Sequence, residues 1–319
     1  MRTIVLYHAD CPDGFTAAWA AWKKFGDAAE YIPARFDEEE RADLTGSDVY
    51  IVDFSYPRDV TLAIKEEAAS LVVLDHHKTA RERLEGIEGC HFDMERSGAG
   101  MSWDYFHPDK PRPRLISYVE DRDLWRFNLL HSKEVNSVVT SYEFTFDNWN
   151  AMHVQLETDF ESVRSEGVAI LRSKMQYVAV MVAKNSHRES FLGYEDIPIV
   201  NAPHISISEL VGRLAEDAQF AVGWSQAADG AFLYSLRSRG DGIDVSEVAS
   251  AMEGGGHRGS AGFHSRLPPW ELTKDVKDTL ERYEMAEHLS GDGAWLGPDS
   301  GDDISQAIDS EPPPAPEKT

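Results

Sequence analysis

Short apolar runs rich in β-branched residues alternate with helical patterns through the first third of the chain. The apolar runs cover residues 3–7, 49–52 and 71–74, and the helical patterns between them cover residues 15–25 and 60–69. This alternation is typical of βαβ units, in which successive strands are parallel and lie in one sheet. The pattern therefore predicts an α/β fold whose N-terminal part is built on a parallel sheet.

A polar cluster follows each of these three predicted strands. The clusters are residues 8–14 (HADCPDG), residues 53–55 (DFS) and residues 75–77 (DHH). Ligands of open α/β sheets sit at the carboxyl ends of the strands, so the three clusters are expected to converge on one crevice. The side chains that they offer to a metal ion are His8, Asp10, Asp13, Asp53, Asp75, His76 and His77.

These side chains have the chemistry of a divalent metal centre. Carboxylates suit Mn²⁺ and Mg²⁺, and imidazole joins them readily when the ion is Mn, Fe, Co or Zn. Two ions about 3.5–4 Å apart need a carboxylate to bridge them, and such a pair activates water and holds a phosphoryl group. Each cluster also has a structural explanation, because residues 12–14 are ordinary turn residues and Asp53 is placed to cap the next helix.

The remainder of the chain predicts a helical region, a connecting helix and a second mixed unit. The pattern over residues 97–127 predicts helices interrupted by prolines. The pattern over residues 157–184 predicts one long helix that bridges two domains. The predicted elements of the second unit are strands at 197–200, 220–224 and 231–236, and helices at 208–216, 245–252 and 270–288.

These patterns predict four segments. Residues 1–155 form the first domain, 156–188 the linker helix, and 189–289 a smaller mixed α/β domain. Residues 290–319 are rich in Gly, Asp, Ser and Pro and contain little to bury, which is typical of a disordered acidic tail.

A glycine-rich stretch in the second domain is the other candidate ligand site. In residues 254–262 (GGGHRGSAG), Gly254, Gly255 and Gly256 allow the backbone to approach an anion, and His257 can donate to a phosphate oxygen. Arg237 and Arg239 lie upstream on one face of a predicted strand, where guanidinium groups can pair with phosphates. A flexible loop and solvated arginines are the structural alternatives.

The charge of the chain limits its partners. Lys and Arg number 31 against 56 Asp and Glu, which gives a net charge of −25. A field of this sign disfavours long duplex nucleic acid, so a phosphate ester substrate is expected to be small. Two cysteines and the lack of an apolar run of about 18 residues predict a cytoplasmic protein without a membrane span.

Residues 3–265 resemble the DHH phosphoesterase superfamily. The similarity extends to the DHH-associated substrate-binding domain of nano-RNases and RecJ-type exonucleases. The motifs that carry it are HADCPDG at 8–14, VDFS at 52–55, LDHH at 74–77, SGAG at 97–100, YVEDRDLW at 118–125, SLRSR at 235–239 and GGGHRGSAG at 254–262.

This resemblance implies a phosphohydrolase with two metal ions, usually Mn²⁺, with Mg²⁺ or Co²⁺ as substitutes. It implies that Asp53 bridges the ions and that His77 donates to the substrate phosphate, with Asp75 orienting the imidazoles. The terminal metal ligands that it implies are His8, Asp13, His76 and Asp121, with Asp123 as the rival of Asp121. In the second domain it implies that Arg237, Arg239 and residues 254–257 hold the far end of the substrate.

The first motif departs from the family pattern. The family has two aspartates separated by one residue, whereas Cys11 and Pro12 separate Asp10 from Asp13 here. Either Asp10 enters the site or that ligand is lost, with Cys11 nearby. A thiolate would favour softer ions, but Mn²⁺ is expected because carboxylates predominate.

The expected function is hydrolysis of short nucleotides, namely oligoribonucleotides, cyclic dinucleotides or a nucleoside bisphosphate. The first alternative is a RecJ-like 5′-3′ exonuclease on single-stranded DNA, which the net charge disfavours although Trp125 and Trp224 can stack on bases. The second is a homologue that binds nucleotides without cleaving them. Apolar residues on the helices of the first domain would permit a homodimer.

Overall fold

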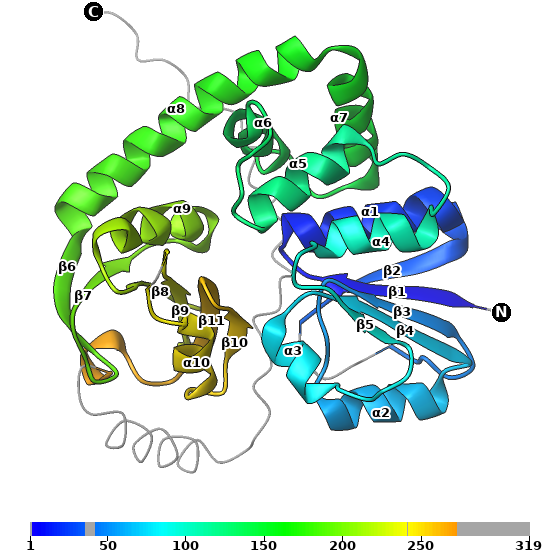
Figure 1. The fold of residues 1–319 in the computed structure, drawn as a ribbon, viewed down its shortest axis with the longest axis horizontal. Helices are drawn as coiled ribbons and strands as arrows, with labels where there is room; N and C mark the ends of the chain where they lie inside the picture. The colour runs from blue at the N-terminus through cyan, green and yellow to red at the C-terminus, as the bar shows by residue number, and fades with distance from the viewer. Residues whose placement is uncertain (1, 36–41, 241, 273–319) are drawn as a thin grey trace, which may run out of the picture.

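The computed structural model of the chain describes residues 2–35, 42–240 and 242–272, which form two lobes joined by one long helix (Figure 1). The first lobe contains a five-stranded parallel sheet with the order β2-β1-β3-β4-β5. Its strands are β1 (Thr3–His8), β2 (Ala29–Ala34), β3 (Asp48–Val52), β4 (Ser70–Asp75) and β5 (Cys90–Phe92). The predicted α/β fold with an N-terminal parallel sheet is confirmed.

The sequence patterns missed the two edge strands, β2 and β5. β2 carries Glu30 and Pro33 and is only partly buried, and β5 has three residues. Neither has the continuous apolar run that marks β1, β3 and β4, because an edge strand lacks a neighbour on one side and is less completely covered.

Helices cover both faces of this sheet. In Figure 1, α1 (Pro12–Phe25) and α4 (Gly98–Phe106) lie above it, and α2 (Arg58–Glu67) and α3 (Lys78–Arg83) lie below. Successive residues of β1 alternate between two apolar clusters: Ile4 packs on the α2 side and Val5 packs against α1. Burial on both faces is therefore the reason that the central strands read as unbroken apolar runs.

A helical layer completes the first lobe. It consists of α5 (Arg114–Asp123), α6 (Ser132–Val139) and α7 (Phe146–Thr158), and it packs on α1 through Trp19 and Trp149. The predicted helical stretch 97–127 divides into α4 and α5 at its prolines, where a helix cannot continue.

The long helix α8 (Phe160–Asn185) spans the distance between the two lobes (Figure 1). Its first turn is capped by the side chain of Asp159, which accepts a hydrogen bond from the Ser162 backbone N–H at 3.3 Å. The prediction of one helix over 157–184 is therefore correct apart from its first residues, which belong to α7.

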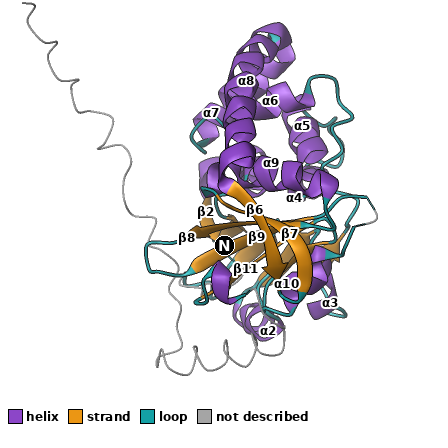
Figure 2. Cartoon of the chain, turned by 90° about the vertical axis from the view of Figure 1, so that its left-hand side faces the viewer, coloured by secondary structure: helices purple, strands orange, loops and turns teal. Residues whose placement is uncertain are grey.

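The second lobe is a mixed six-stranded sheet with the order β10-β11-β9-β8-β7-β6 and with β7 and β8 parallel. Figure 2 shows α8 and α9 (His204–Leu214) above its strands, and the other helix is α10 (Val245–Ser250). The strands are β6 (Ser186–Phe191), β7 (Tyr194–Asn201), β8 (Ala221–Gln226), β9 (Phe232–Arg237), β10 (Gly255–His257) and β11 (Ser260–Ser265).

The C-terminal predictions lie mostly outside the described residues. A 3₁₀ turn at Pro269–Glu271 stands where the helix over 270–288 was expected to begin, and the predicted tail at 290–319 is not described. None of the helices in the described ranges is long and apolar enough to cross a lipid bilayer.

Candidate metal centre

The carboxyl ends of β1, β3 and β4 meet at one point of the first lobe. The His8 Nδ1 atom lies 3.5 Å from the Asp53 Oδ2 atom, and the His76 Nε2 atom lies 3.1 Å from the Asp53 Oδ1 atom. Asp53 and His76 are almost fully buried, whereas about a third of the His8 side chain is exposed. The structure thus brings together one side chain from each polar cluster, as parallel strand ends require.

Asp53 occupies the middle of this arrangement with an unusual backbone conformation. Its φ of 66° lies in the left-handed region, which a residue with a side chain seldom adopts outside constrained sites. The Asp53 N–H donates to the Leu74 carbonyl at 2.9 Å. Both carboxylate oxygens of Asp53 and the Nδ1 atom of His8 are buried without a hydrogen-bond partner among the described residues.

Asp13 is held by the N-terminus of α4. Its Oδ2 accepts a hydrogen bond from the Gly98 N–H at 2.6 Å, and its Oδ1 accepts one from the Ala99 N–H at 3.2 Å. Because these N–H groups have no partner within the helix, they hold a carboxylate firmly. The Asp13 Oδ2 atom lies 3.9 Å from the His76 Nε2 atom, so Asp13 joins the cluster.

The structure places Asp123, rather than the preferred Asp121, beside the histidines. The Asp123 Oδ2 atom is 3.6 Å from the His76 Nε2 atom. Asp121 instead accepts backbone hydrogen bonds from Asn128 at 2.9 Å and from Leu129 at 3.2 Å, and so closes the turn after α5. Positions two apart on a helix differ by about 200° in direction, so only one of these two aspartates can face the site.

Asp10 does not enter the cluster. Its side chain is 64% exposed and forms an ion pair with Arg35 just after β2. Cys11, the next residue, lies beside the cluster instead: its Sγ atom is within 4.8 Å of ligand atoms of both His8 and Asp53. The expectation that Asp10 provides a ligand therefore differs from the observed placement, because Arg35 pairs with Asp10 at the surface.

Asp75 positions the imidazole of His77. The Asp75 Oδ1 atom accepts hydrogen bonds from the backbone N–H groups of His76 at 2.7 Å and His77 at 3.1 Å. The same atom lies 2.7 Å from the His77 Nδ1 atom. The Asp75 Oδ2 atom accepts the Ser55 hydroxyl at 2.5 Å. Burial opposes ionisation, but His77 outweighs it and lowers the pKa of Asp75 to about 2. An ionised Asp75 holds a proton on the Nδ1 atom of His77 and so fixes the orientation of the imidazole.

The second lobe contributes His257 to the same place. The centre of its ring lies 4.7 Å from the ring centres of both His76 and His77, and it stacks on His77 at an interplanar angle of 19°. Burial, together with the charges of His77 and His76, lowers the pKa of His257 to about 2. The neutral imidazole of His257 therefore packs against the strand-end histidines.

The three glycines belong to the contact between the lobes. Gly255 lies against α3 so closely that a β-carbon on it would be 2.7 Å from the Thr79 hydroxyl, and the Gly254 carbonyl accepts a hydrogen bond from Arg83 at 3.2 Å. Gly256 has a φ of 139°, which side-chain-bearing residues rarely adopt. The stretch is therefore a shaped edge, with Gly255 and Gly256 in β10, rather than a flexible loop.

The two predicted arginines have different surroundings. Within the described part of the chain, the Arg237 guanidinium donates to three neutral oxygens, at 3.0 Å to Ser235 Oγ, 2.8 Å to the Leu236 carbonyl and 2.9 Å to Ser208 Oγ. Burial, assisted by the charge of Arg122, lowers the pKa of Arg237 to about 10. Arg239 lies over the ring of Trp125 in the first lobe at 5.9 Å, beside Glu216. Arg237 is thus the better placed of the two to receive an anion.

The cluster concentrates negative charge in a buried place. Burial and the neighbouring Asp53 and Asp123 raise the pKa of Asp13 well above its ordinary range, and burial likewise raises the pKa of Asp123. The aspartates overcome the effect of burial on His76 and raise its pKa. Carboxylates that cannot all remain ionised together attract either protons or a cation.

The donor set fits divalent metal ions. Asp13, His76 and Asp123 form one group whose ligand atoms lie within 4.8 Å of one another, and His8, Cys11 and Asp53 form a second. Asp53 directs Oδ2 towards His8 and Oδ1 towards His76, so one carboxylate lies between the two groups. Its unpartnered oxygens are what a bridging ligand would present before a metal binds.

Comparison with solved structures identifies the fold. The DHH domain of a protein from a ribosomal-protein family superposes with a TM-score of 0.53, at 13% sequence identity, over 92% of this chain and 87% of that domain. This chain has the DHH-domain fold. Asp75, His76 and His77 of this chain form the sequence DHH at the carboxyl end of β4.

Other comparisons give weaker likenesses. The pGpG-specific phosphodiesterase PggH from Vibrio cholerae has a TM-score of 0.48 and 11% identity over 92% of this chain and all of that one. RecJ from Thermus thermophilus, solved with Mn²⁺, has a TM-score of 0.49 and 14% identity over 89% of this chain and 52% of that one.

No family model matches the sequence of this chain. One curated relative, the uncharacterized protein R106 of Acanthamoeba polyphaga mimivirus, is 31% identical over 288 residues. These cover 82% of this chain and 66% of the relative, so the chain spans slightly less than two thirds of that protein.

Sequence reasoning missed the groups that hold the ligands. The backbone N–H groups of Gly98 and Ala99 fix Asp13, and the only signal for them was the SGAG motif. Ser55 is part of a strand-end cluster, but no feature of the sequence indicates that its hydroxyl donates to Asp75. Such supporting contacts depend on chain segments that meet only after folding.

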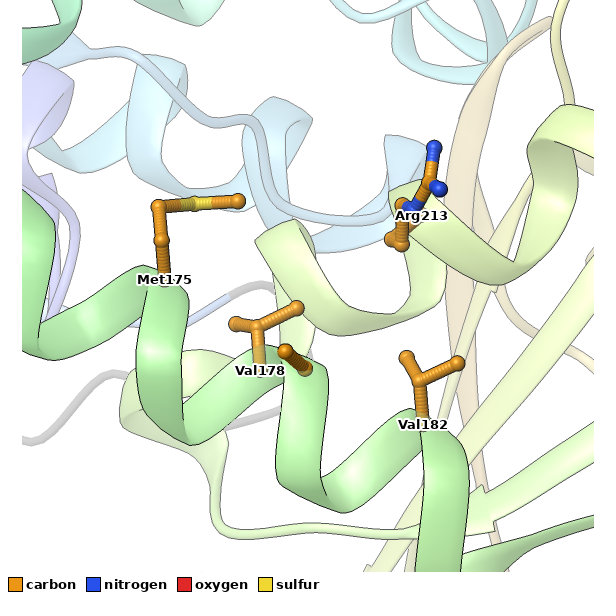
Figure 3. A pocket seen from close by; sticks show the side chains of 5 residues that line it. Met175, Val178, Val182 and Arg213 are labelled. Atoms are coloured by element: carbon orange, nitrogen blue, oxygen red, sulfur yellow. The ribbon is translucent and has the colours of Figure 1, made fainter.

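A hollow elsewhere on the molecule has different chemistry. It lies between α8 and α9, has a volume of about 220 Å³, and is lined by Met175, Val178, Ala179, Val182 and Arg213 (Figure 3). It shares none of its residues with the metal centre, and its mainly apolar lining has neither carboxylate nor imidazole. The candidate site is therefore the cluster at the strand ends.

Proposed function

We propose that this DHH protein is a metal-dependent phosphoesterase that hydrolyses short nucleotides with two Mn²⁺-type ions. The observation that carries the proposal is the position of Asp53, whose two buried, unpartnered oxygens face separate groups of metal ligands. Among common protein sites, a carboxylate shared between two ligand groups is a feature of two-metal phosphoryl transfer.

Each ion would be held by residues of one group. Asp13, His76 and Asp123 would hold one ion, His8 the other, and Asp53 would bridge them. Such ions, when bound, polarise a phosphoryl group and activate water for attack on phosphorus. Mg²⁺ and Co²⁺ are expected substitutes for Mn²⁺, because the donors are mainly carboxylates and imidazoles.

The protein's own groups would orient the substrate. Burial disfavours the charged form of His77, but Asp75 outweighs burial and raises the pKa of His77. The imidazolium, held through Nδ1 by Asp75, would donate from Nε2 to a phosphate oxygen. His257 stacks on His77, and the second lobe would therefore lie beside the substrate phosphate. Arg237, whose hydrogen bonds go to neutral oxygens, would pair with the far phosphate or the sugar–phosphate end.

The charge of the chain supports a short substrate. With a net charge of −25, the chain as a whole repels a long polyanion, whereas a dinucleotide needs favourable potential only at the site. Trp125 is already covered by Arg239, which leaves its ring less available as a stacking platform for a long single strand. Oligoribonucleotides, cyclic dinucleotides or a nucleoside bisphosphate are therefore the proposed substrates.

The test offers four substrates to the purified chain with Mn²⁺: a labelled dinucleotide, a cyclic dinucleotide, 3′-phosphoadenosine 5′-phosphate and a long single strand. Turnover of one of the three short substrates is expected. Preference for the long strand would favour a RecJ-like exonuclease, and tight binding without product would favour a nucleotide-binding homologue. Failure to cleave any of them with metal bound would refute the enzymatic proposal.

A pair of aspartate variants tests the assignment of Asp53 as the ligand shared by the two ions. Asp53→Asn should abolish both hydrolysis and binding of the second ion, because it removes the shared charge. Asp10→Asn is the matched control, since Asp10 belongs to the same motif but pairs with Arg35 at the surface. Equal loss of activity in both variants would contradict the assignment.

A further inference from the structure

We propose that the Cys11 thiolate is a ligand of the ion held by His8 and Asp53, so that this position prefers Zn²⁺ or Co²⁺ to Mg²⁺. The inference rests on the proposed function in that it takes Asp53 as a metal ligand. It goes further because it assigns a sulfur ligand, and with it a metal preference, to one of the two positions.

Cys11 is placed by the junction between β1 and α1. It precedes the first helical residue, Pro12, and has an extended backbone with φ of −114° and ψ of 125°. Its sulfur, the His8 nitrogen and an Asp53 oxygen all lie within 4.8 Å of one another. Two ligands of one zinc-sized ion stand about 3–4.5 Å apart, given metal–ligand bonds of about 2.0–2.3 Å, so small side-chain adjustments suffice.

A second observation points to a ligand at this place. The His8 Nδ1 atom and both Asp53 oxygens are buried without hydrogen-bond partners in the described part of the chain, and Asp53 is only 1% exposed. Buried polar atoms are seldom left unpaired, because such an atom has lost its hydrogen bonds to water without replacing them. An ion between His8, Cys11 and Asp53 would satisfy these atoms together.

The position of Asp10 explains why a sulfur atom would complete the ligand set of this ion. Asp10 is the neighbouring carboxylate that could have completed a ligand set without sulfur, but it pairs with Arg35 and faces solvent. The group that remains is one imidazole, one thiol and one shared carboxylate. Thiolate favours zinc and other borderline ions over Mg²⁺, whereas the group of Asp13, His76 and Asp123 has no sulfur. Binding releases the thiol proton to solvent as the metal–sulfur bond forms.

The experiment replaces Mn²⁺ by Co²⁺ in the full chain and records the absorption spectrum during titration. The wild type should show a sulfur-to-cobalt charge-transfer band in the near ultraviolet. Cys11→Ser should lose this band while keeping ligand-field absorption from cobalt at the other position. Cys90→Ser is the matched control and should keep the band, because Cys90, the other cysteine, lies in β5.

Competition titrations provide a second readout. Cys11→Ser should weaken the affinity for Zn²⁺ or Cd²⁺ by about tenfold or more, and the affinity for Mn²⁺ by much less. Circular dichroism establishes that the variants are folded. A wild-type protein that binds Co²⁺ without the band, or a Cys11→Ser protein that keeps it, overturns the sulfur assignment and leaves the proposed hydrolase intact. Absence of any metal binding by the wild type would instead refute the proposed function.

Discussion

Gly98 lies so close to Asp53 that a β-carbon on Gly98 would stand 2.4 Å from the Asp53 β-carbon. The same glycine donates its N–H to Asp13 at 2.6 Å. One residue without a side chain therefore lets the start of α4 contact two proposed metal ligands at once. The close packing that places Asp53 between the two ligand groups depends on this glycine.

Gly98→Ala should consequently disturb the metal centre. The added methyl group must displace Asp53 or the start of α4, which is expected to cost about 1–3 kcal/mol of stability and at least about tenfold in metal affinity. Isothermal titration with Mn²⁺ and urea denaturation measure the two effects. Gly259→Ala is the control, because a β-carbon there would meet only the Ser238 carbonyl, at 3.3 Å. Unchanged Mn²⁺ affinity in Gly98→Ala would contradict the placement of Asp53.

Asp75→Asn should reduce the rate of hydrolysis while metal remains bound. An asparagine side chain has only one acceptor oxygen for the hydrogen bonds that both carboxylate oxygens of Asp75 now accept. His77 would therefore lose its fixed orientation. A reduction in kcat of about 10–100-fold is expected. Ser55→Ala, which removes only the contact to Asp75 Oδ2, should cause a smaller decrease in the same direction. Equal rates for the wild type and Asp75→Asn would show that His77 needs no such support.

Arg237→Gln should raise KM more than it lowers kcat. The guanidinium is proposed to hold the far end of the substrate, away from the reacting phosphorus, so its loss should raise KM by about tenfold or more. The control is Arg266→Gln, since Arg266 lies near the surface beside Asp229. Steady-state kinetics on a dinucleotide separates the two constants. A decrease confined to kcat would place Arg237 at the reaction centre instead.

His107 should make the fold less stable as the pH falls below about 6.5. Its Nε2 atom donates to the Ala20 carbonyl at 2.9 Å, and burial, with the charges of Lys110 and Lys24, lowers its pKa in the folded state. The unfolded chain therefore takes up a proton at a higher pH than the folded chain. The stabilising contribution is complete above the unfolded pKa and declines as the pH decreases through that value.

Urea denaturation at pH 7.5 and pH 5.5 tests this sign. The wild type should lose more free energy of unfolding between these pH values than His107→Gln, which lacks the titrating imidazole. His187→Gln serves as the control, because His187 is exposed on β6. An identical pH dependence in the wild type and His107→Gln would show that burial does not lower the pKa of His107 in the folded state.

Local sequence patterns were sufficient for much of the fold and part of the site. The apolar runs of β1, β3 and β4 marked the central strands, and the polar residues after them contained His8, Asp53 and His76. A parallel sheet aligns its strand ends by geometry alone, so these side chains could be expected to meet. The edge strands β2 and β5 were not predicted, because partly buried strands carry too few apolar residues to form a clear pattern.

The sequence by itself determined the α/β class, the alternating strands and helices, and the presence of carboxylates and imidazoles at three strand ends. Only the tertiary structure decided that Asp123 rather than Asp121 faces His76, that Arg35 draws Asp10 to the surface, and that His257 stacks on His77. Strand periodicity and chain order are local properties. The rotation of a helix, the partner of a surface charge and the approach of two lobes depend on packing between segments far apart in the chain.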